Sequence, residues 1–249
     1  MSPATALPPK PELAALAQRL ARLGAGHGRL GTVPVASLGA DEMDAALPGR
    51  GLRFAALHEV AGVGAAGFAA GLLARFAAVR EGALLWCQQR RRMRDEGMLY
   101  GPGLRRLGVE PARLLVVTAR DDGEALWVLE EALRSPAVAA AVGEVGTVDL
   151  FRTRRLQLAA EAGGGAGLLL RPREPTVEPS AAVTRWRVRL RAPPPGPDLG
   201  SLRWTAELWR AKGAVPARFE VAFDEPTLRF HLVADLADRP FSLGRQKAG

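Results

Sequence analysis

Two glycines in the stretch LHEVAGVGAAGFAAGLL, residues 57–73, have the spacing of a phosphate-binding loop. Gly62 and Gly67 are separated by four residues, as in G-x-x-x-x-G-K-[ST], and they lie between a strand-like run and a helix-like run. In that motif the lysine reaches the β- and γ-phosphates, and the hydroxyl that follows it holds magnesium. Phe68 and Ala69 occupy those two positions here, and neither side chain can do this chemistry.

The loop is open to two interpretations from its residues alone. A glycine-rich turn at a helix N-terminus can bind an anion through its backbone N–H groups. In the other interpretation the strand, turn and helix serve only the fold, and Phe68 fills the volume that a phosphate would otherwise occupy. We expect the second, and therefore no cofactor.

The elements that position this loop alternate between strands and helices. Apolar runs predict strands over 55–60, 83–87, 113–119, 138–145 and 166–172. Helical periodicity predicts helices over 67–80, 99–107, 122–135 and 153–163. From about residue 182 the pattern changes: RWRVRLRA alternates strictly, and RWTAELWRAKG and ARFEVAFD are expected to form a further antiparallel pair. These patterns predict an α/β fold, a mainly parallel twisted sheet flanked by helices, with antiparallel edge strands near the C-terminus.

Composition changes suggest three parts of the chain. Residues 1–51 are expected to form an N-terminal helix and a linker that wraps onto the main domain, residues 52–235 the core domain, and residues 236–249 a flexible tail. The helix expected over 11–23 carries four leucines at helical spacing, the last of them Leu23. Leu13, Leu16 and Leu20 either pack on the chain's own domain or contact a partner.

The whole-chain composition limits the class of protein. The formal net charge is +8, and 31 of the 34 basic residues are arginine, which favours phosphate-bearing or acidic partners. No run is long and apolar enough for a membrane span, so no membrane partner is expected. The single cysteine, Cys87, fits a cytoplasmic protein. His27, His58 and His231 lack metal-ligand spacing, so no metal site is expected.

Three arginine clusters are candidate contacts for DNA or for a protein partner. Arg185, Arg187 and Arg189 are two residues apart along one expected strand, about 6–7 Å between neighbours, which is close to the phosphate spacing of single-stranded DNA. A solvated arginine face explains the same pattern. The other two clusters lie after the second strand and at the start of a helix: Arg90, Arg91 and Arg92, and Arg154 and Arg155.

The order of elements and several of their sequences resemble the RecA core fold. The stretch LYGPGLRRLGVEPARLLVVTARDDGEALWVLEEALRS, residues 99–135, carries most of this similarity. Over residues 52–225 the chain is most similar to the ImuA family, the RecA-like and SulA-like accessory proteins of bacterial mutagenesis cassettes. The shared sequences include LHEVAG, AAGFA, LWC, LYGPGL, VGEV, RRLQLAAEAG and LLLRP.

The resemblance to RecA also says which residues ATP hydrolysis would need. A glutamate after the second strand would position water, but Gln88 and Gln89 stand there. An aspartate would end the strand VAAAVGEV, where Gly143 falls, and Glu144 could replace it only by a one-residue shift. Together with Phe68, these departures argue against ATP turnover, and no catalytic residue is assigned.

The resemblance implies an accessory role in damage-induced, error-prone translesion DNA synthesis. The partners it implies are an ImuB-like Y-family polymerase homologue, RecA, an error-prone replicative-type polymerase and single-stranded DNA, with nucleoid association when DNA is damaged. Two alternatives stay open: a SulA-like inhibitor of cell division that binds FtsZ, and a DNA-dependent RecA-like ATPase with a rearranged site.

Overall fold

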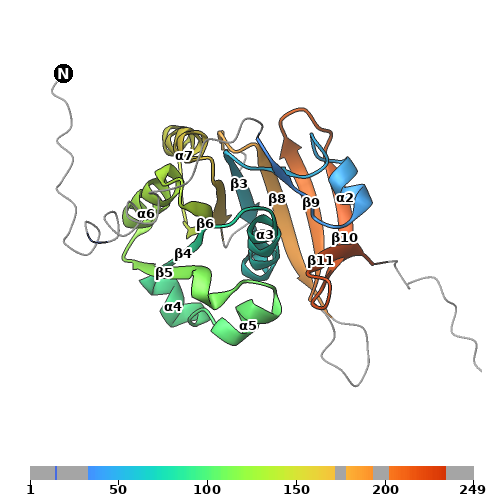
Figure 1. Ribbon diagram of the computed structural model, residues 1–249, viewed down its shortest axis with the longest axis horizontal. Helices are drawn as coiled ribbons and strands as arrows, with labels where there is room; N and C mark the ends of the chain where they lie inside the picture. Colours follow the sequence, from blue (N-terminus) through green and yellow to red (C-terminus); the bar gives the residue numbers. More distant parts are fainter. Residues whose placement is uncertain (1–14, 16–32, 172–177, 193–201, 234–249) are drawn as a thin grey trace, which may run out of the picture.

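The computed structural model describes residues 15, 33–171, 178–192 and 202–233. Its centre is a nine-stranded sheet with the order β11-β10-β9-β8-β3-β7-β6-β4-β5 (Figure 1). The parallel part contains β3 (Ala56–Ala61), β4 (Ala83–Gln89), β5 (Leu114–Ala119), β6 (Val138–Glu144) and β7 (Ala166–Arg171). This part and its helices confirm the expected α/β fold.

The C-terminal strands extend the sheet beyond β3. β8 (Thr184–Arg191) runs parallel to β3, and the strands after it are antiparallel: β9 (Arg203–Ala211), β10 (Ala217–Asp224) and β11 (Arg229–Leu232). The alternation of RWRVRLRA puts Trp186 and Val188 on the buried side. The antiparallel strands near the C-terminus are therefore confirmed, and β11 is a strand that the sequence patterns did not predict.

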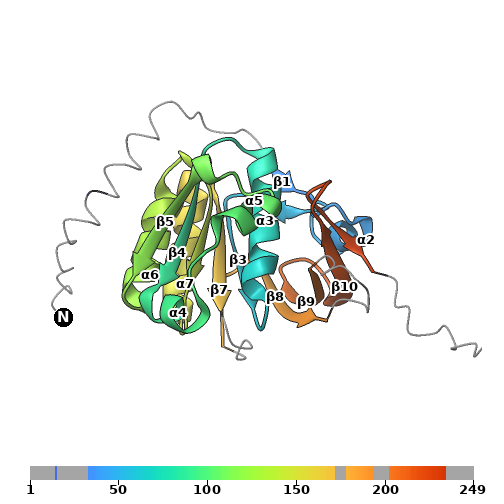
Figure 2. The ribbon, with the colours of Figure 1, turned by 90° about the horizontal axis from the view of Figure 1, so that it is seen from below.

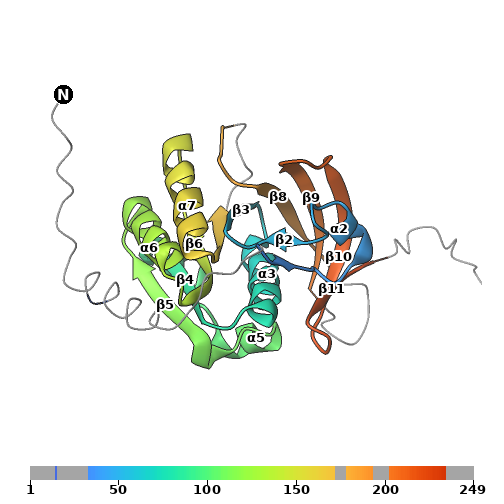
Figure 3. The same cartoon turned by 45° about the horizontal axis from the view of Figure 1, so that its top comes forward.

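Helices cover both faces of the parallel strands. α3 (Ala65–Val79) packs on one face, where it meets Trp86 and Trp186 in one apolar cluster. α6 (Asp122–Arg134) and α7 (Leu150–Gly163) lie side by side on the other face, over a second cluster that includes Leu57 and Leu85 (Figures 1 and 3). Parallel strands buried on both faces explain the nearly unbroken apolar runs in β6 and β7.

Residues 33–54 pack against the antiparallel end of the sheet. They form a two-stranded sheet, β1 (Val35–Ala36) with β2 (Leu52–Arg53), and a short helix, α2 (Asp41–Ala45) (Figure 2). Met43 is fully buried in the same cluster as α3, and Phe230 N donates to Leu38 O at 3.0 Å. This segment thus adds apolar volume beside β11.

Short helical segments connect β4 to β5. Residues 90–96, where the sequence patterns predicted no helix, form α4 (Arg90–Glu96), and α5 (Gly101–Arg106) and a 3₁₀ turn, η1 (Pro111–Arg113), follow. Ion pairs between residues four apart, such as Arg92 with Glu96, stabilise α4. The sequence does not indicate these pairs by itself, because residues four apart are neighbours only in a helix. None of the helices in the described residues has both the length and the apolar character needed to cross a membrane.

Candidate functional site

The glycine loop is a tight three-residue turn. β3 ends at Ala61 and α3 begins at Ala65, so only Gly62, Val63 and Gly64 lie between them. Gly62 and Gly64 have φ angles of 115° and 87°, which side chains rarely adopt. A Cβ at Gly62 would lie 2.2 Å from Val188 O, so β8 passes directly against the turn. α3 begins before Gly67. Some of the backbone N–H groups between Gly62 and Gly67 therefore belong to the helix and do not form an open loop around a phosphate.

Strands β8 and β9 bind the backbone of this turn. Leu190 N donates to Val63 O at 3.0 Å, and the indole Nε1 of Trp204 donates to Gly64 O at 3.1 Å. On the other side, Gly62 N donates to Arg171 O at 3.1 Å. The turn is therefore hydrogen-bonded to three strands of its own sheet.

Phe68 points into the core directly behind the turn. It is fully buried, with ring centroids 5.8 Å from Trp186, 5.8 Å from Trp204 and 5.0 Å from Phe230. Ala69 is also fully buried. The two positions that carry lysine and a hydroxyl in a phosphate-binding loop are thus occupied by apolar side chains that hold α3 against the antiparallel strands.

The two glutamines at the end of β4 form hydrogen bonds that link the sheet to neighbouring segments. Gln88 Oε1 accepts a hydrogen bond from Leu99 N at 3.1 Å, which ties the α4–α5 connection to the sheet. Gln89 donates to the carboxylate of Asp122, at the start of α6. Both side chains are therefore committed to bonds within the chain.

Asp122 joins three segments at this edge of the sheet. Besides Gln89, it accepts from Gly146 N at 2.8 Å and Thr147 N at 3.0 Å. Burial acts to raise the pKa of Asp122, but these hydrogen bonds act to lower it, and the net pKa is below the ordinary value. The neighbouring Asp121 caps α6 by accepting from Glu124 N at 2.9 Å.

Glu144 is a buried carboxyl at the end of β6. Its Oε1 accepts from the indole of Trp86 at 2.9 Å, and Arg92 Nη1 lies 3.7 Å from its Oε2. Burial raises the pKa of Glu144, and the Trp86 bond and the Arg92 charge oppose this shift. β7 separates β6 from β3, so this carboxyl is about two strand spacings, roughly 10 Å, from the glycine turn. The geometry makes Glu144 an anchor for Trp86 and α4.

The arginine stripe on β8 is not a uniform solvated surface, and the assignment of Arg185 as a DNA contact was wrong. Arg185 is fully buried, with its Nε 2.8 Å from Glu59 Oε2, and Arg171 Nη1 lies 3.2 Å from Glu59 Oε1. The reason is its register: Arg185 pairs with Glu59 of β3 inside the sheet, where no nucleic acid can reach it.

Arg187, the next residue of the stripe, lies beside a carboxylate of the neighbouring strand. Arg187 Nη1 is 3.2 Å from Glu207 Oε2, and its guanidinium lies 5.6 Å from the ring centre of Trp209. Arg189 is exposed. The sequence does not indicate which residues lie opposite one another on neighbouring strands. The one available signal was Glu59, because a charged residue within an apolar run must have a partner of opposite charge when it is buried.

The other two clusters differ in how far their charges are neutralised. Arg90 and Arg91 are exposed on α4, whereas the side chain of Arg92 lies between Glu96 and Glu144. On α7, Arg155 Nη2 is 2.8 Å from Glu130 Oε2, while Arg154 is exposed. Leu13, Leu16 and Leu20 lie outside the described residues.

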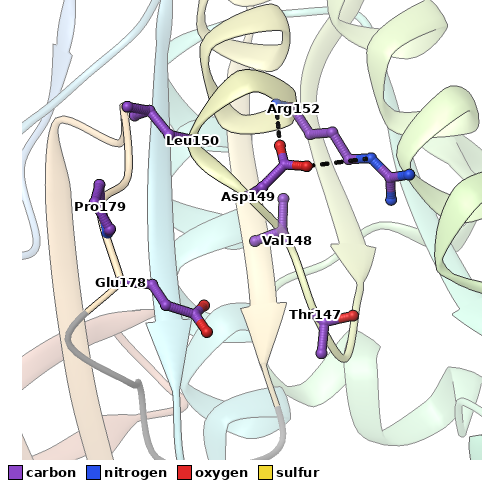
Figure 4. Close-up of a pocket in the computed structure, with 7 residues that line it drawn as sticks. All are labelled: Thr147, Val148, Asp149, Leu150, Arg152, Glu178 and Pro179. Carbon is purple, nitrogen blue, oxygen red and sulfur yellow. Dashed lines mark hydrogen bonds and ion pairs between the residues drawn. The ribbon is translucent and has the colours of Figure 1, made fainter.

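A hollow of about 410 Å³ opens beside the start of α7 (Figure 4). Its walls come from the β6–α7 connection and from Glu178 and Pro179, ahead of β8. Asp149 caps α7 there by accepting from Arg152 N at 2.7 Å. Within the described ranges, no group of three or more histidine, cysteine, aspartate or glutamate residues could hold a metal ion.

Comparison with known proteins gives a clear relative. The chain is 38% identical over 228 residues to Protein ImuA of Caulobacter vibrioides strain NA1000 / CB15N, covering 82% of this chain and 91% of that protein. Protein ImuA of the strain ATCC 19089 / CIP 103742 / CB 15 matches with the same identity and coverage. No protein-family model matches the chain.

Proposed function

The chain belongs to the ImuA family, and on this premise we propose that it is a non-catalytic accessory protein of damage-induced, error-prone translesion DNA synthesis. In this role it binds an ImuB-like Y-family polymerase homologue and bridges it to RecA, to an error-prone replicative-type polymerase, or to single-stranded DNA at the nucleoid. Its contribution is a set of surfaces held in place by a rigid core.

The packing of Phe68 carries the non-catalytic part of this proposal. A phosphate at the glycine turn would need open space and free backbone N–H groups in front of α3. Instead, the ring of Phe68 fills the interior behind the turn, and the N–H groups of Gly62 and Ala65 donate to Arg171 O and Gly62 O. β3, the turn and α3 therefore have a structural role: they connect the parallel strands to the antiparallel strands.

The surroundings of Glu144 speak against a rearranged ATPase site. A general base must reach the attacking water, either directly or through one water molecule. Glu144 is buried, bonded to Trp86 and about two strands away from the turn. ATP hydrolysis that single-stranded DNA stimulates and that Glu144→Gln abolishes would restore the enzymatic alternative.

The partner is tested by purification after co-expression. We expect the tagged chain to retain the ImuB-like homologue encoded in the same genome through size-exclusion chromatography at moderate salt. A tagged unrelated α/β protein of similar charge is the matched control. Reproducible absence of the complex, with both proteins folded, would overturn the proposed role.

A further inference from the structure

The outer face of α7 is an apolar surface that no described element covers. Phe151 is 70% exposed and Leu158 is 54% exposed, and α7 lies on the outside of the molecule beside α6 (Figure 3). At 3.6 residues per turn, Phe151 and Leu158 fall on the same side of the helix, two turns and about 10.5 Å apart. Arg154 and Arg155 lie in the turn between them, one on each side. We call these four residues the α7 face.

Two observations show that the α7 face is not needed for the chain's own core. The inward side of α7 is complete, because Leu156, Ala159 and Ala160 are buried against the sheet and α6. Leu150, in the same first turn, is also 48% exposed. Large apolar side chains gathered on one helix face are typical of a contact surface rather than of a solvated helix.

The charges on the α7 face select an acidic occupant. Arg155 is held by Glu130, with 2.8 Å between Nη2 and Oε2. The side chain of Arg154 makes no hydrogen bond or ion pair within the described part of the chain, and it therefore presents a cation between two apolar side chains. A partner carboxylate facing Arg154 would satisfy it.

The same surroundings disfavour a polyanion such as nucleic acid. Glu161 and Glu130 lie next to the α7 face, and a phosphate backbone would meet them as well as the arginines. A helix can instead place two apolar side chains seven residues apart and a single carboxylate between them. Beside this face, a hollow of about 210 Å³ lined by Trp127, Arg152 and Leu156 offers room for one further side chain.

We propose that the α7 face binds an amphipathic helical segment of a partner protein that carries carboxylates beside its apolar side chains. The proposal rests on the proposed function, because the partner that would supply this segment is the ImuB-like homologue. Phe151 and Leu158 would be the apolar anchors, and Arg154 would set the register and the charge preference.

The test measures the affinity of the full chain for the purified homologue by biolayer interferometry. We expect the double variant Phe151→Ser, Leu158→Ser to bind at least tenfold more weakly. Arg154→Glu should weaken binding about tenfold, and this loss should shrink at high salt. Arg210→Glu on β9 and Val215→Ser in the β9–β10 connection make the same kinds of change at exposed positions away from α7, and both variants should stay within twofold of the wild-type chain. Circular dichroism and thermal melting verify that each variant is folded.

The outcomes separate this proposal from the proposed function. If the wild-type chain and the double variant bind the homologue equally well, the α7 face is not the binding surface, and the proposed function is unaffected. Stronger binding by Arg154→Glu would mean a basic segment and would also overturn it. Loss of self-association in the double variant, with unchanged binding of the homologue, would assign the face to a second copy. Absence of binding by the wild-type chain would overturn the proposed function and this assignment together.

Discussion

Arg185 and Glu59 form a buried ion pair between adjacent strands, with 2.8 Å between Nε and Oε2 and both side chains 1% exposed. Arg171 approaches the same carboxylate at 3.2 Å and also lies 3.6 Å from the half-exposed Glu178, so Glu59 is the buried carboxylate that the two guanidinium groups share. Arg185 also lies 4.3 Å above the ring of Trp209. This cluster joins β3, β7 and β8, the strands where the parallel and antiparallel parts of the sheet meet.

Removing the charge of Glu59 should therefore be costly. We expect Glu59→Gln to lower the free energy of unfolding by about 3–5 kcal/mol, because it leaves the buried Arg185 without a counter-ion and leaves Arg171 only the half-exposed Glu178, 3.6 Å away. Denaturation by urea measures this change. Glu207→Gln, which removes a half-exposed partner of Arg187, should cost less than about 1 kcal/mol. Similar losses in the two variants would contradict the buried pair.

The close contact between Gly62 and β8 leads to a second stability prediction. Gly62→Ala should lower the free energy of unfolding by about 3 kcal/mol, since a strained backbone and an overpacked contact each cost about 1–3 kcal/mol. The control is Gly101→Ala, because a Cβ there would meet nothing within 4 Å. We expect that variant to stay within about 0.5 kcal/mol of the wild-type chain. A tolerated alanine at Gly62 would mean that β8 does not press on the turn.

Restoring the motif residues should not restore a nucleotide site. We expect the double variant Phe68→Lys, Ala69→Ser to show no binding of a fluorescent ATP analogue with magnesium. It should also lose about 3–5 kcal/mol of stability, because it removes a fully buried aromatic side chain. Phe151→Lys makes the same exchange at an exposed position and should leave stability nearly unchanged. Nucleotide binding by the folded double variant would show that the turn can open.

The sequence patterns were sufficient to predict the main helices and strands but not the short segments that connect or extend them. Apolar runs and helical periodicity located β3 to β7, α3, α6 and α7, because each is long enough to show its period. β11 and α4 are short, and their stability comes from neighbours such as Phe230 in the core and Glu144 beside Arg92, which no local pattern reveals. Residues 33–54 pack through scattered apolar side chains without any period.

The site residues divide in the same way. The substitutions at Phe68 and Ala69 could be read directly, because the motif fixes what each position must do. The role of Arg185 could not, because the alternation in RWRVRLRA tells which side chains share a face but not what lies opposite them. Trp204 was equally hidden: its bond to Gly64 O joins residues 140 positions apart in the chain.

The buried histidine of β3 gives a pH prediction. Burial is the main effect on His58 and lowers its pKa from 6.5 to about 4, while its bond to Arg53 O opposes that shift. The imidazole is therefore neutral in the folded chain, with its Nδ1 2.8 Å from Thr184 Oγ1. As pH falls below 6.5 the unfolded chain gains a proton that the folded chain does not, so stability decreases until about pH 4.

The size of this effect follows from the shift. Between pH 6.5 and pH 4 the free energy of unfolding should fall by about 3 kcal/mol through His58 alone. His58→Gln should remove that part of the pH dependence, whatever its effect on stability at neutral pH. Parallel profiles for the wild-type chain and His58→Gln would contradict a neutral buried imidazole.

We expect binding of single-stranded DNA to depend on α4 more than on the arginine stripe of β8. Arg90 and Arg94 are exposed, and neither belongs to an ion pair within the described residues, whereas Arg187 already faces Glu207. We expect the triple variant Arg90→Gln, Arg91→Gln, Arg94→Gln to weaken binding and to reduce the slope of log K against log salt by about 2–3, roughly 1 per phosphate contact.

The matched variant Arg187→Gln, Arg189→Gln keeps the buried Arg185 in place and should change the slope by less than about 1. Fluorescence anisotropy with a labelled oligonucleotide at several salt concentrations measures both slopes, and a larger effect from the β8 variant would return the DNA contact to that strand.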